Sequence, residues 1–229
     1  MDICFILVEP AVPENIGAAA RAINTMGFSE LRLVNPANHL ADESKWLAHG
    51  SIELLEKAKI YQNFKDAIED LDFVIGTTAK KRSTNYDYYS PENARKIIEK
   101  KANTISQVGI VFGREESGLK NEELSNCDIA SSIPLKKPYP SLNLAQSVML
   151  FAYVFSSVKA LEMKSKSDVN SSDHIYHELK INTENILQEL NITKDSVLYH
   201  RMLERIASIN EDDARLFLSF AKKFKHKFE

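Results

Sequence analysis

The chain has 229 residues, of which 44% are hydrophobic and 27% charged, and this composition supplies enough apolar side chains for a globular core. The net charge of −3 argues against a protein that coats nucleic acid indiscriminately, although local basic patches can still bind phosphate. The apolar run near the N-terminus follows an acidic residue and is too short for a signal peptide or a membrane span. We therefore expect a cytoplasmic protein that does not contact a membrane.

The cysteine and histidine content predicts neither disulfides nor a metal site. Cys4 and Cys127 lie far apart and form no C-x-x-C pair, so we expect both to be small buried side chains. His174 and His177 are spaced to share one face of a helix. A metal site needs a third ligand, and none lies nearby in the sequence.

Short apolar runs alternate with helical patterns through the first two thirds of the chain, which is typical of an α/β domain with a mainly parallel sheet. Five or six strands fit this region. The runs with the composition of strands buried on both faces are Ile3–Val8, Leu31–Val34, Phe73–Thr77, Val108–Phe112 and Ala130–Ile133.

Helix signals lie between these runs. A helix is predicted over Ile16–Met26, where Asn15 is a possible N-cap and Gly27 suits the left-handed residue after a helix. A second helix is predicted over Pro91–Lys101, with Ser90 as its cap and proline at the first helical position.

The last third of the chain is predicted to be helical. Residues 142–163 are apolar around most of a helix circumference, which favours a helix buried under the sheet or in a subunit interface. Residues 164–172 are polar and rich in serine, as in a linker. We expect an α/β domain over residues 1–163, a linker over residues 164–172 and a helical extension over residues 173–229.

Several common enzyme motifs are absent from the sequence. No G-x-G-x-x-G fingerprint follows the first strand, and no G-x-S-x-G elbow is present, which argues against a dinucleotide-binding oxidoreductase and a serine hydrolase. The segment Gly113–Lys120 resembles a phosphate-binding loop, but its lysine comes one residue late. Asn121 replaces the magnesium-binding hydroxyl, and Glu115 and Glu116 would repel phosphate.

Polar clusters instead follow predicted strands, at the sheet edge where open α/β folds bind ligands. The first contains Asn15, Gly17 and Arg21, and its structural alternative is a capped helix with a surface arginine. The second is the turn over residues 113–118, which presents Glu115. Its structural alternative is a glycine-rich turn with solvated charges.

The third cluster is Ser141-Leu142-Asn143, which stands at the start of the predicted apolar helix. Its structural alternative is Ser141 acting only as an N-cap.

Together, N-x-G-x-x-x-R at residues 15–21, G-x-E-x-x-G at residues 113–118 and S-L-N at residues 141–143 resemble the three signature motifs of the SpoU/TrmH methyltransferases within the SPOUT class. Each motif is weak alone, but the ordered set is specific, and the resemblance covers about residues 1–160. With LVNP at 33–36 and GTTAKKR at 76–82, the chain is most similar to bacterial tRNA (cytidine/uridine-32) 2′-O-methyltransferases and to a sister branch with no settled substrate.

The resemblance implies an α/β domain with a C-terminal trefoil knot and a homodimer whose active site lies at the interface. It implies S-adenosylmethionine-dependent 2′-O-methylation of a ribose in RNA, with the tRNA anticodon loop at position 32 as the expected target. Two alternatives stay open: methylation of rRNA, and a catalytically silent RNA-binding protein of the same fold.

The resemblance also assigns residues to roles. The cofactor pocket is expected to be lined by Thr77, Thr78, Ala79, Gly113, Ile133, Ser141, Leu142 and Asn143. Arg21 is assigned to the reacting 2′-hydroxyl, with Asn15 orienting it and Glu115 holding the arrangement.

The chemical role of Arg21 stays open between a general base and a cation that stabilises the developing alkoxide. Because arginine retains its proton in nearly all protein settings, we favour the cation. Lys80, Lys81 and Arg82 follow the predicted cofactor strand and are expected to contact RNA phosphates. The chemistry requires no metal.

Overall fold

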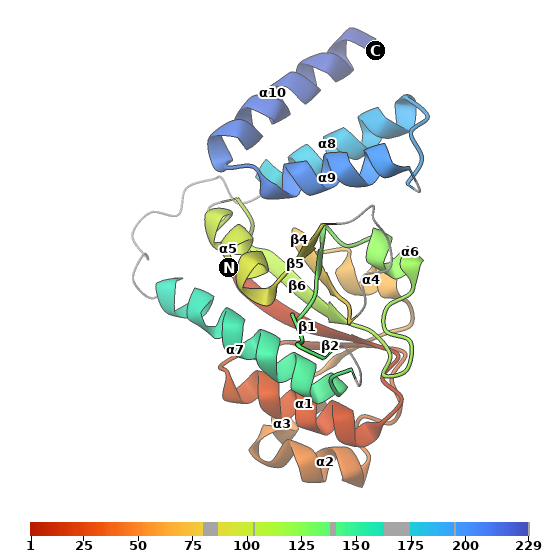
Figure 1. Ribbon diagram of the computed structural model, residues 1–229, viewed down its shortest axis with the longest axis vertical. Helices are drawn as coiled ribbons and strands as arrows, with labels where there is room; N and C mark the ends of the chain where they lie inside the picture. The colour runs from red at the N-terminus through yellow and green to blue at the C-terminus, as the bar shows by residue number, and fades with distance from the viewer. Residues whose placement is uncertain (80–86, 103, 138–140, 163–174, 195, 229) are drawn as a thin grey trace.

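A parallel sheet lies at the centre of the computed structural model, which describes residues 1–79, 87–102, 104–137, 141–162, 175–194 and 196–228 (Figure 1). Its seven strands have the order β3-β2-β1-β6-β4-β7-β5, and every neighbouring pair is parallel. The strands are β1 (Asp2–Val8), β2 (Leu31–Val34), β3 (Lys59–Tyr61), β4 (Phe73–Thr77), β5 (Tyr88–Tyr89), β6 (Gln107–Phe112) and β7 (Ile129–Ser131).

Four of the five predicted apolar runs form strands, and the fifth, Ala130–Ile133, overlaps β7, which ends at Ser131. The predicted α/β class with a parallel sheet is confirmed. The two edge strands of the sheet, β3 and β5, were not among the predicted strands. Both are short, and Lys59 and Ile60 of β3 are exposed, so neither produces the continuous buried run that marks the central strands.

Helices cover both faces of the sheet. Alternate residues of β1 point to opposite sides. Phe5 and Leu7 pack with α1 (Pro13–Thr25) and α7 (Leu144–Glu162), whereas Cys4 and Ile6 pack with α4 (Phe64–Ile68) and α6 (Asn121–Ser125). The helices of this domain are α1 (Pro13–Thr25), α2 (Asp42–Ala48), α3 (Ile52–Glu56), α4 (Phe64–Ile68), α5 (Pro91–Lys100), α6 (Asn121–Ser125) and α7 (Leu144–Glu162), with a 3₁₀ turn at His49–Ser51.

The start of α1 differs from the prediction. Asn15 does not cap this helix, because the helix begins two residues earlier at Pro13, whose fixed φ and missing N–H suit the first position, and Val12 is the N-cap. The predicted end is confirmed, since Gly27 follows the helix with φ of 84°. Gly17 allows α2 to approach, because a Cβ at this position would lie 2.0 Å from the carbonyl oxygen of Ser44.

The helix α7 is apolar, as its sequence predicts, and its buried residues include Val148, Phe151 and Phe155. On its opposite side, Leu150 is 41% exposed and Tyr153 is 66% exposed. The predicted cap of α5 is also confirmed: Ser90 Oγ accepts a hydrogen bond from the backbone N–H of Asn93.

Three helices follow: α8 (Ile175–Glu189), α9 (Val197–Ser208) and α10 (Glu211–Phe228). They dock at the amino-terminal ends of the central strands, at one end of the molecule (Figure 1). The Tyr176 hydroxyl donates to Asp128 Oδ1 at 3.1 Å, and Lys180 Nζ lies 2.8 Å from the same oxygen. Asp128 Oδ2 accepts the N–H of Val74 at 2.7 Å, so one carboxylate joins α8 to the sheet.

The predicted helical extension is therefore present, and the predicted linker lies outside the described residues. The trefoil knot stays a prediction. Cys4 is buried and Cys127 is partly exposed, and both thiols are free. Burial raises the pKa of the Cys4 thiol to about 12. Among the described helices, none has the length and apolar character that a membrane span requires.

Candidate active site

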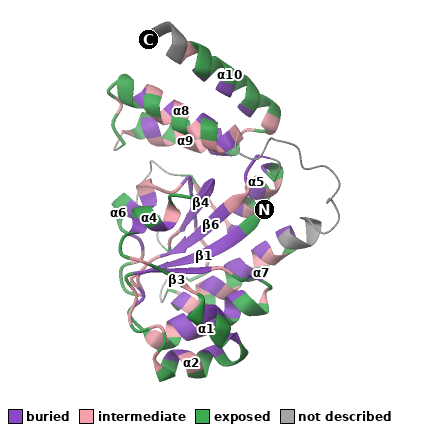
Figure 2. Ribbon diagram, turned by 180° about the vertical axis from the view of Figure 1, so that it is seen from behind, coloured by how far each residue is buried: buried purple, intermediate pink, exposed green. Residues whose placement is uncertain are grey.

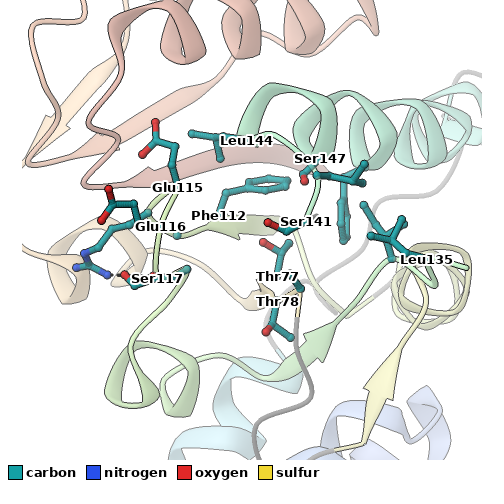
Figure 3. A pocket seen from close by; sticks show the side chains of 17 residues that line it. Thr77, Thr78, Phe112, Glu115, Glu116, Ser117, Leu135, Ser141, Leu144 and Ser147 are labelled. Carbon is teal, nitrogen blue, oxygen red and sulfur yellow. Dashed lines mark hydrogen bonds between the residues drawn. The ribbon is translucent and has the colours of Figure 1, made fainter. Parts of the chain in front are cut away.

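A cavity of about 260 Å³ lies at the carboxyl ends of β4 and β6 and beside the start of α7 (Figure 3). Seven of the eight residues predicted to bind the cofactor line it. These residues are Thr77, Thr78, Ala79, Gly113, Ile133, Ser141 and Leu142. Apolar side chains of Phe112, Leu135, Leu144 and Phe151 form part of the walls. The turn over residues 114–118, which includes the predicted site residue Glu115, and Ser147 line the rest, so the cavity combines apolar surface with polar groups.

The turn after β6 forms one wall of the cavity, and glycine is required in it. A Cβ on Gly113 would lie 2.1 Å from the carbonyl carbon of Gly118 and 2.1 Å from the nitrogen of Leu119, so any side chain would force the turn open. Gly118 itself has φ of 68°, a left-handed conformation that favours glycine.

Arg114 fixes this turn to the neighbouring strand end. Its guanidinium donates to Glu9 at 2.7 Å, to both carboxylate oxygens of Glu123, and to the carbonyl oxygen of Gly118 at 3.3 Å. Arg114 holds the pKa of Glu9 below its usual range. Burial alone would raise the pKa of Glu123, but hydrogen bonds from Arg114 and the N–H of Lys120 lower it. Both carboxylates therefore stay charged at neutral pH.

Glu115 joins the second motif to the first. Its carboxylate accepts the backbone N–H groups of Ala11 at 3.1 Å and Val12 at 3.3 Å, and the side-chain amide of Asn15 at 3.0 Å. Burial opposes the charged form of Glu115, but these donors outweigh burial and lower its pKa. In Figure 3 the carboxylate of Glu115 points away from Thr77. Its contacts are therefore those of a group that holds the loop before α1.

Asn15 extends this chain of hydrogen bonds to the third motif. Its Oδ1 accepts the side-chain N–H of Asn143 at 2.8 Å, so Glu115, Asn15 and Asn143 connect all three motifs across more than a hundred residues of sequence. The contacts are partly exposed, and each donor has its acceptor within 3.0 Å.

Asn143 caps α7, and Ser141 does not. The helix begins at Leu144, and Asn143 Oδ1 accepts the N–H groups of Ala145 at 2.8 Å and Gln146 at 3.4 Å. Gln146 Oε1 returns the contact by accepting the N–H of Asn143 at 3.2 Å. Asn143 is the one predicted cofactor residue that does not line the cavity; it fixes the geometry of the loop that does.

The other predicted site residues have different positions. Arg21 is exposed on α1 and does not line the cavity, and its side chain makes no hydrogen bond or ion pair with the described part of the chain. Lys80, Lys81 and Arg82 lie outside the described residues. No cluster of three or more potential metal ligands occurs among the residues that the structure describes.

Four residues that contribute to the site were not predicted from the sequence: Glu9, Arg114, Glu123 and Gln146. Glu9 and Arg114 follow β1 and β6, which are neighbours in the sheet, so opposite charges at the two strand ends were a usable signal. The N-x-x-Q spacing of Asn143 and Gln146 was a usable signal of a reciprocal cap. Glu123 gave no comparable signal, because its role depends on the fold of the turn.

Comparisons with known proteins agree with the motifs. A model of the SpoU rRNA Methylase family matches residues 2–153. LasT of Escherichia coli (strain K12), an uncharacterized tRNA/rRNA methyltransferase, is 37% identical over 216 residues, which are 94% of each chain. The tRNA (cytidine-2′-O-)-methyltransferase TrmJ of Methanocaldococcus jannaschii is 41% identical over 151 residues, which are 66% of each chain.

A solved structure extends the likeness to the C-terminal helices. The probable methylase family protein of Haemophilus influenzae Rd KW20 superposes with a TM-score of 0.67 at 31% identity, covering 99% of this chain and 98% of the other. The family match spans more than half of this chain, and the likeness to LasT spans nearly all of it. The chain belongs to the SpoU methylase family, whose members are S-adenosylmethionine-dependent RNA 2′-O-methyltransferases, as its three motifs predict.

Proposed function

We propose that this protein methylates the 2′-hydroxyl of a ribose in tRNA, at position 32 of the anticodon loop. The observation that carries the proposal is the hydrogen-bonded chain from Glu115 through Asn15 to Asn143, which joins the three motifs beside the cavity. The names of the TrmJ relatives, which specify tRNA and 2′-O-methylation, support this substrate class.

The cavity suits S-adenosylmethionine in its chemistry. Its apolar walls match an adenine ring, and the strand-end backbone around Thr77 and Gly113 offers groups to the polar parts of the molecule. The absence of a side chain at Gly113 keeps the turn closed against the cavity. In this proposal the seven lining residues of the predicted set hold the cofactor, and Asn143 shapes their loop. The cofactor supplies a methyl group on a cationic sulfur.

Arg21 is proposed to act on the ribose. An arginine that remains protonated anchors a phosphate and stabilises negative charge on the reacting oxygen. Asn15 and Glu115 do not contact Arg21 in one chain; they position the loop and the first turn of the helix that carries it. The hydrogen bonds of Asn15 and Glu115 therefore support a role in positioning α1, which carries Arg21.

We propose a homodimer in which Arg21 of one chain completes the cavity of the other. The exposure of Arg21 and its absence from the lining of its own cavity support this arrangement. The exposed Leu150 and Tyr153 on α7, which packs beside α1, supply an apolar contact surface for a second copy.

Three further features belong to the proposal. Lys80, Lys81 and Arg82 contact RNA phosphates. The chain divides into a methyltransferase domain over residues 1–163, a linker over residues 164–172 and a helical unit over residues 173–229. The protein works in the cytoplasm, where free cysteines persist.

The test is single-turnover methyl transfer from labelled S-adenosylmethionine to unmodified tRNA, followed by mapping of the ribose methyl group. We expect one product, with the label on the 2′-oxygen at position 32. Label in rRNA alone would assign the protein to the rRNA branch. No label, together with no thermal shift on adding the cofactor, would identify a silent RNA-binding protein.

A further inference from the structure

We propose that Glu204 of α9 is a positioning residue for the cofactor cavity, because it fixes the edge strand β5 that holds one wall of the cavity in place. Glu204 Oε1 accepts the backbone N–H of Asp87 at 3.2 Å and the hydroxyl of Tyr89 at 3.3 Å. Asp87 precedes β5 and Tyr89 ends it, so one oxygen of α9 contacts both ends of the strand. The inference rests on the proposed use of this cavity for S-adenosylmethionine.

The strand β5 has little support from the sheet itself. It is two residues long and lies at the edge of the sheet. Among the described strands, β7 alone pairs with it, through Tyr88 opposite Ala130 and Tyr89 opposite Ser131. A strand this short forms too few ladder hydrogen bonds to fix its own position, so contacts from outside the sheet determine where it lies.

The backbone of β5 leads to the cavity. The carbonyl oxygen of Tyr89 accepts the hydroxyl of Ser131 at 3.0 Å and the N–H of Ser132 at 2.9 Å. The carbonyl oxygen of Ser131 in turn accepts the N–H of Thr78 at 2.9 Å. Thr78 lines the cavity, and so does Ile133, the residue after Ser132. A displacement of β5 therefore reaches two lining residues through these hydrogen bonds.

A second contact fixes α9, so that Glu204 can act as an anchor. Lys101, which follows α5, donates from its ammonium to the carbonyl oxygens of Ile206 at 3.2 Å and Ile209 at 3.4 Å, at the end of α9. Lys101 is 2% exposed, and its Nζ lies 4.2 Å from the centre of the Tyr176 ring. Figure 2 shows α9 at the end of the sheet that carries α5. The helix α9 therefore holds the segment from β5 to α5 at both of its ends.

Calorimetry with the full-length protein tests the assignment. We expect Glu204→Ala to weaken S-adenosylmethionine binding by about fivefold, because both hydrogen bonds to β5 are lost. Glu204→Gln should bind within about twofold of the wild type, because the amide oxygen still accepts both donors. Glu184→Ala is the matched control and should leave the affinity unchanged. It removes a hydrogen bond from the Tyr199 hydroxyl at 3.2 Å, which joins α8 to α9 instead of α9 to β5.

Tyr89→Phe tests the pathway from Glu204 to the strand. This substitution removes the hydroxyl and keeps the backbone carbonyl that holds β7. Alone, it should weaken cofactor binding by about twofold. In the Glu204→Ala background it should change nothing further, because its acceptor is already absent. Additive losses in the double variant would overturn this pathway.

Hydrogen exchange in the cofactor-free protein measures the link itself. Peptides that contain Ser132 should exchange faster in Glu204→Ala than in Glu184→Ala. Equal exchange in these two variants overturns the proposal, and so does an equal cofactor affinity. A wild-type protein that binds no S-adenosylmethionine overturns the proposed function, and the exchange result then still decides whether Glu204 holds this wall of the cavity.

Discussion

Glu115 holds the loop before α1 through its charge as well as its shape, because three N–H donors converge on its carboxylate. Glu115→Gln keeps the shape but turns an amide NH₂ towards at least one of these donors. We expect a loss of about 1 to 3 kcal/mol in the free energy of unfolding, together with weaker cofactor binding. Urea unfolding and calorimetry measure the two effects; an unchanged midpoint and affinity would contradict the assigned role.

The same carboxylate gives a pH dependence with a defined sign. Because the pKa of Glu115 is lower in the folded protein than in the unfolded chain, its stabilising contribution is fully present above the unfolded pKa. The contribution is lost as the pH falls through the lowered value. Glu115→Gln should therefore flatten the acid limb of a stability profile and leave neutral and alkaline limbs parallel to those of the wild type.

Asn143 has two separable roles, as the cap of α7 and as a donor to Asn15. Asn143→Ala removes both, and we expect it to weaken S-adenosylmethionine binding by about 1 to 3 kcal/mol. Asn143→Ser keeps a good cap but is too short to replace the amide donor, so it should restore helix stability without restoring cofactor affinity. Calorimetry with thermal unfolding separates these outcomes, and equal recovery of both properties would contradict the division of roles.

The motifs selected residues that the fold places around one cavity, such as Gly113 and Thr77, and their role in binding the cofactor stays a prediction. The mutual contacts of the motifs were not predictable. The contact between Asn15 and Asn143 depends on how two distant loops meet at the sheet edge, and no local spacing encodes that. The prediction that Asn15 caps α1 is wrong, because the helix begins two residues earlier, at Pro13.

At the scale of elements, the C-terminal helices contact the amino-terminal ends of the strands, opposite to the carboxyl ends where the cavity lies. Tyr176 is fully buried, packs with its ring 5.4 Å from that of Phe73 and donates its hydroxyl to Asp128. Burial raises the pKa of Tyr176 well above its usual value, so the hydroxyl remains a donor across the ordinary pH range.

Tyr176→Phe keeps the ring contact and removes the donor. We expect a loss of about 1 kcal/mol in the docking of α8, because Asp128 keeps Lys180 and the N–H of Val74 as partners. Hydrogen exchange in α8 to α10 should become faster, while cofactor affinity should not change. Equal effects on the cofactor cavity would show that the two edges of the sheet are coupled.

Central elements were predictable because burial on both faces leaves a continuous apolar run, as in β1 and β6. The edge strands β3 and β5 lack this signal, since their residues are partly solvated. The docking of α8 to α10 could not be predicted either. Their helical periodicity was plain, but the buried ring of Tyr176 and the pairing of Lys180 with Asp128 depend on distant partners.

At the scale of the whole molecule, one chain joins the predicted catalytic residues Asn15 and Glu115 by a hydrogen bond but does not bring Arg21 into contact with them. Arg21 is exposed on α1 and absent from the cavity lining, whereas Glu115 is one of the lining residues. The motifs predicted which residues to examine, but sequence order carries no information about whether Arg21 serves its own chain or another. Whether Arg21 acts in the site of its own chain or in that of a second chain depends on how two chains assemble, and the two alternatives predict different activities for mixed dimers.

Mixed dimers distinguish action of Arg21 within its own chain from action across the dimer interface. One chain carries Arg21→Ala and keeps an intact cavity; the other carries Gly113→Ala, which opens the turn and disables the cavity but keeps Arg21. Each homodimer should be reduced in single-turnover methyl transfer by on the order of a hundredfold or more. If Arg21 acts across the interface, random mixing restores about a quarter of wild-type activity, because half of the dimers then contain one complete site of two. If Arg21 serves its own chain, no site is complete and mixing restores no activity.

Arg21→Lys in place of Arg21→Ala tests the chemical role of this residue by the same methyl-transfer measurement. If Arg21 only anchors a phosphate, lysine should restore most of the activity. If its guanidinium contacts the phosphate and the 2′-oxygen together, lysine should not restore it.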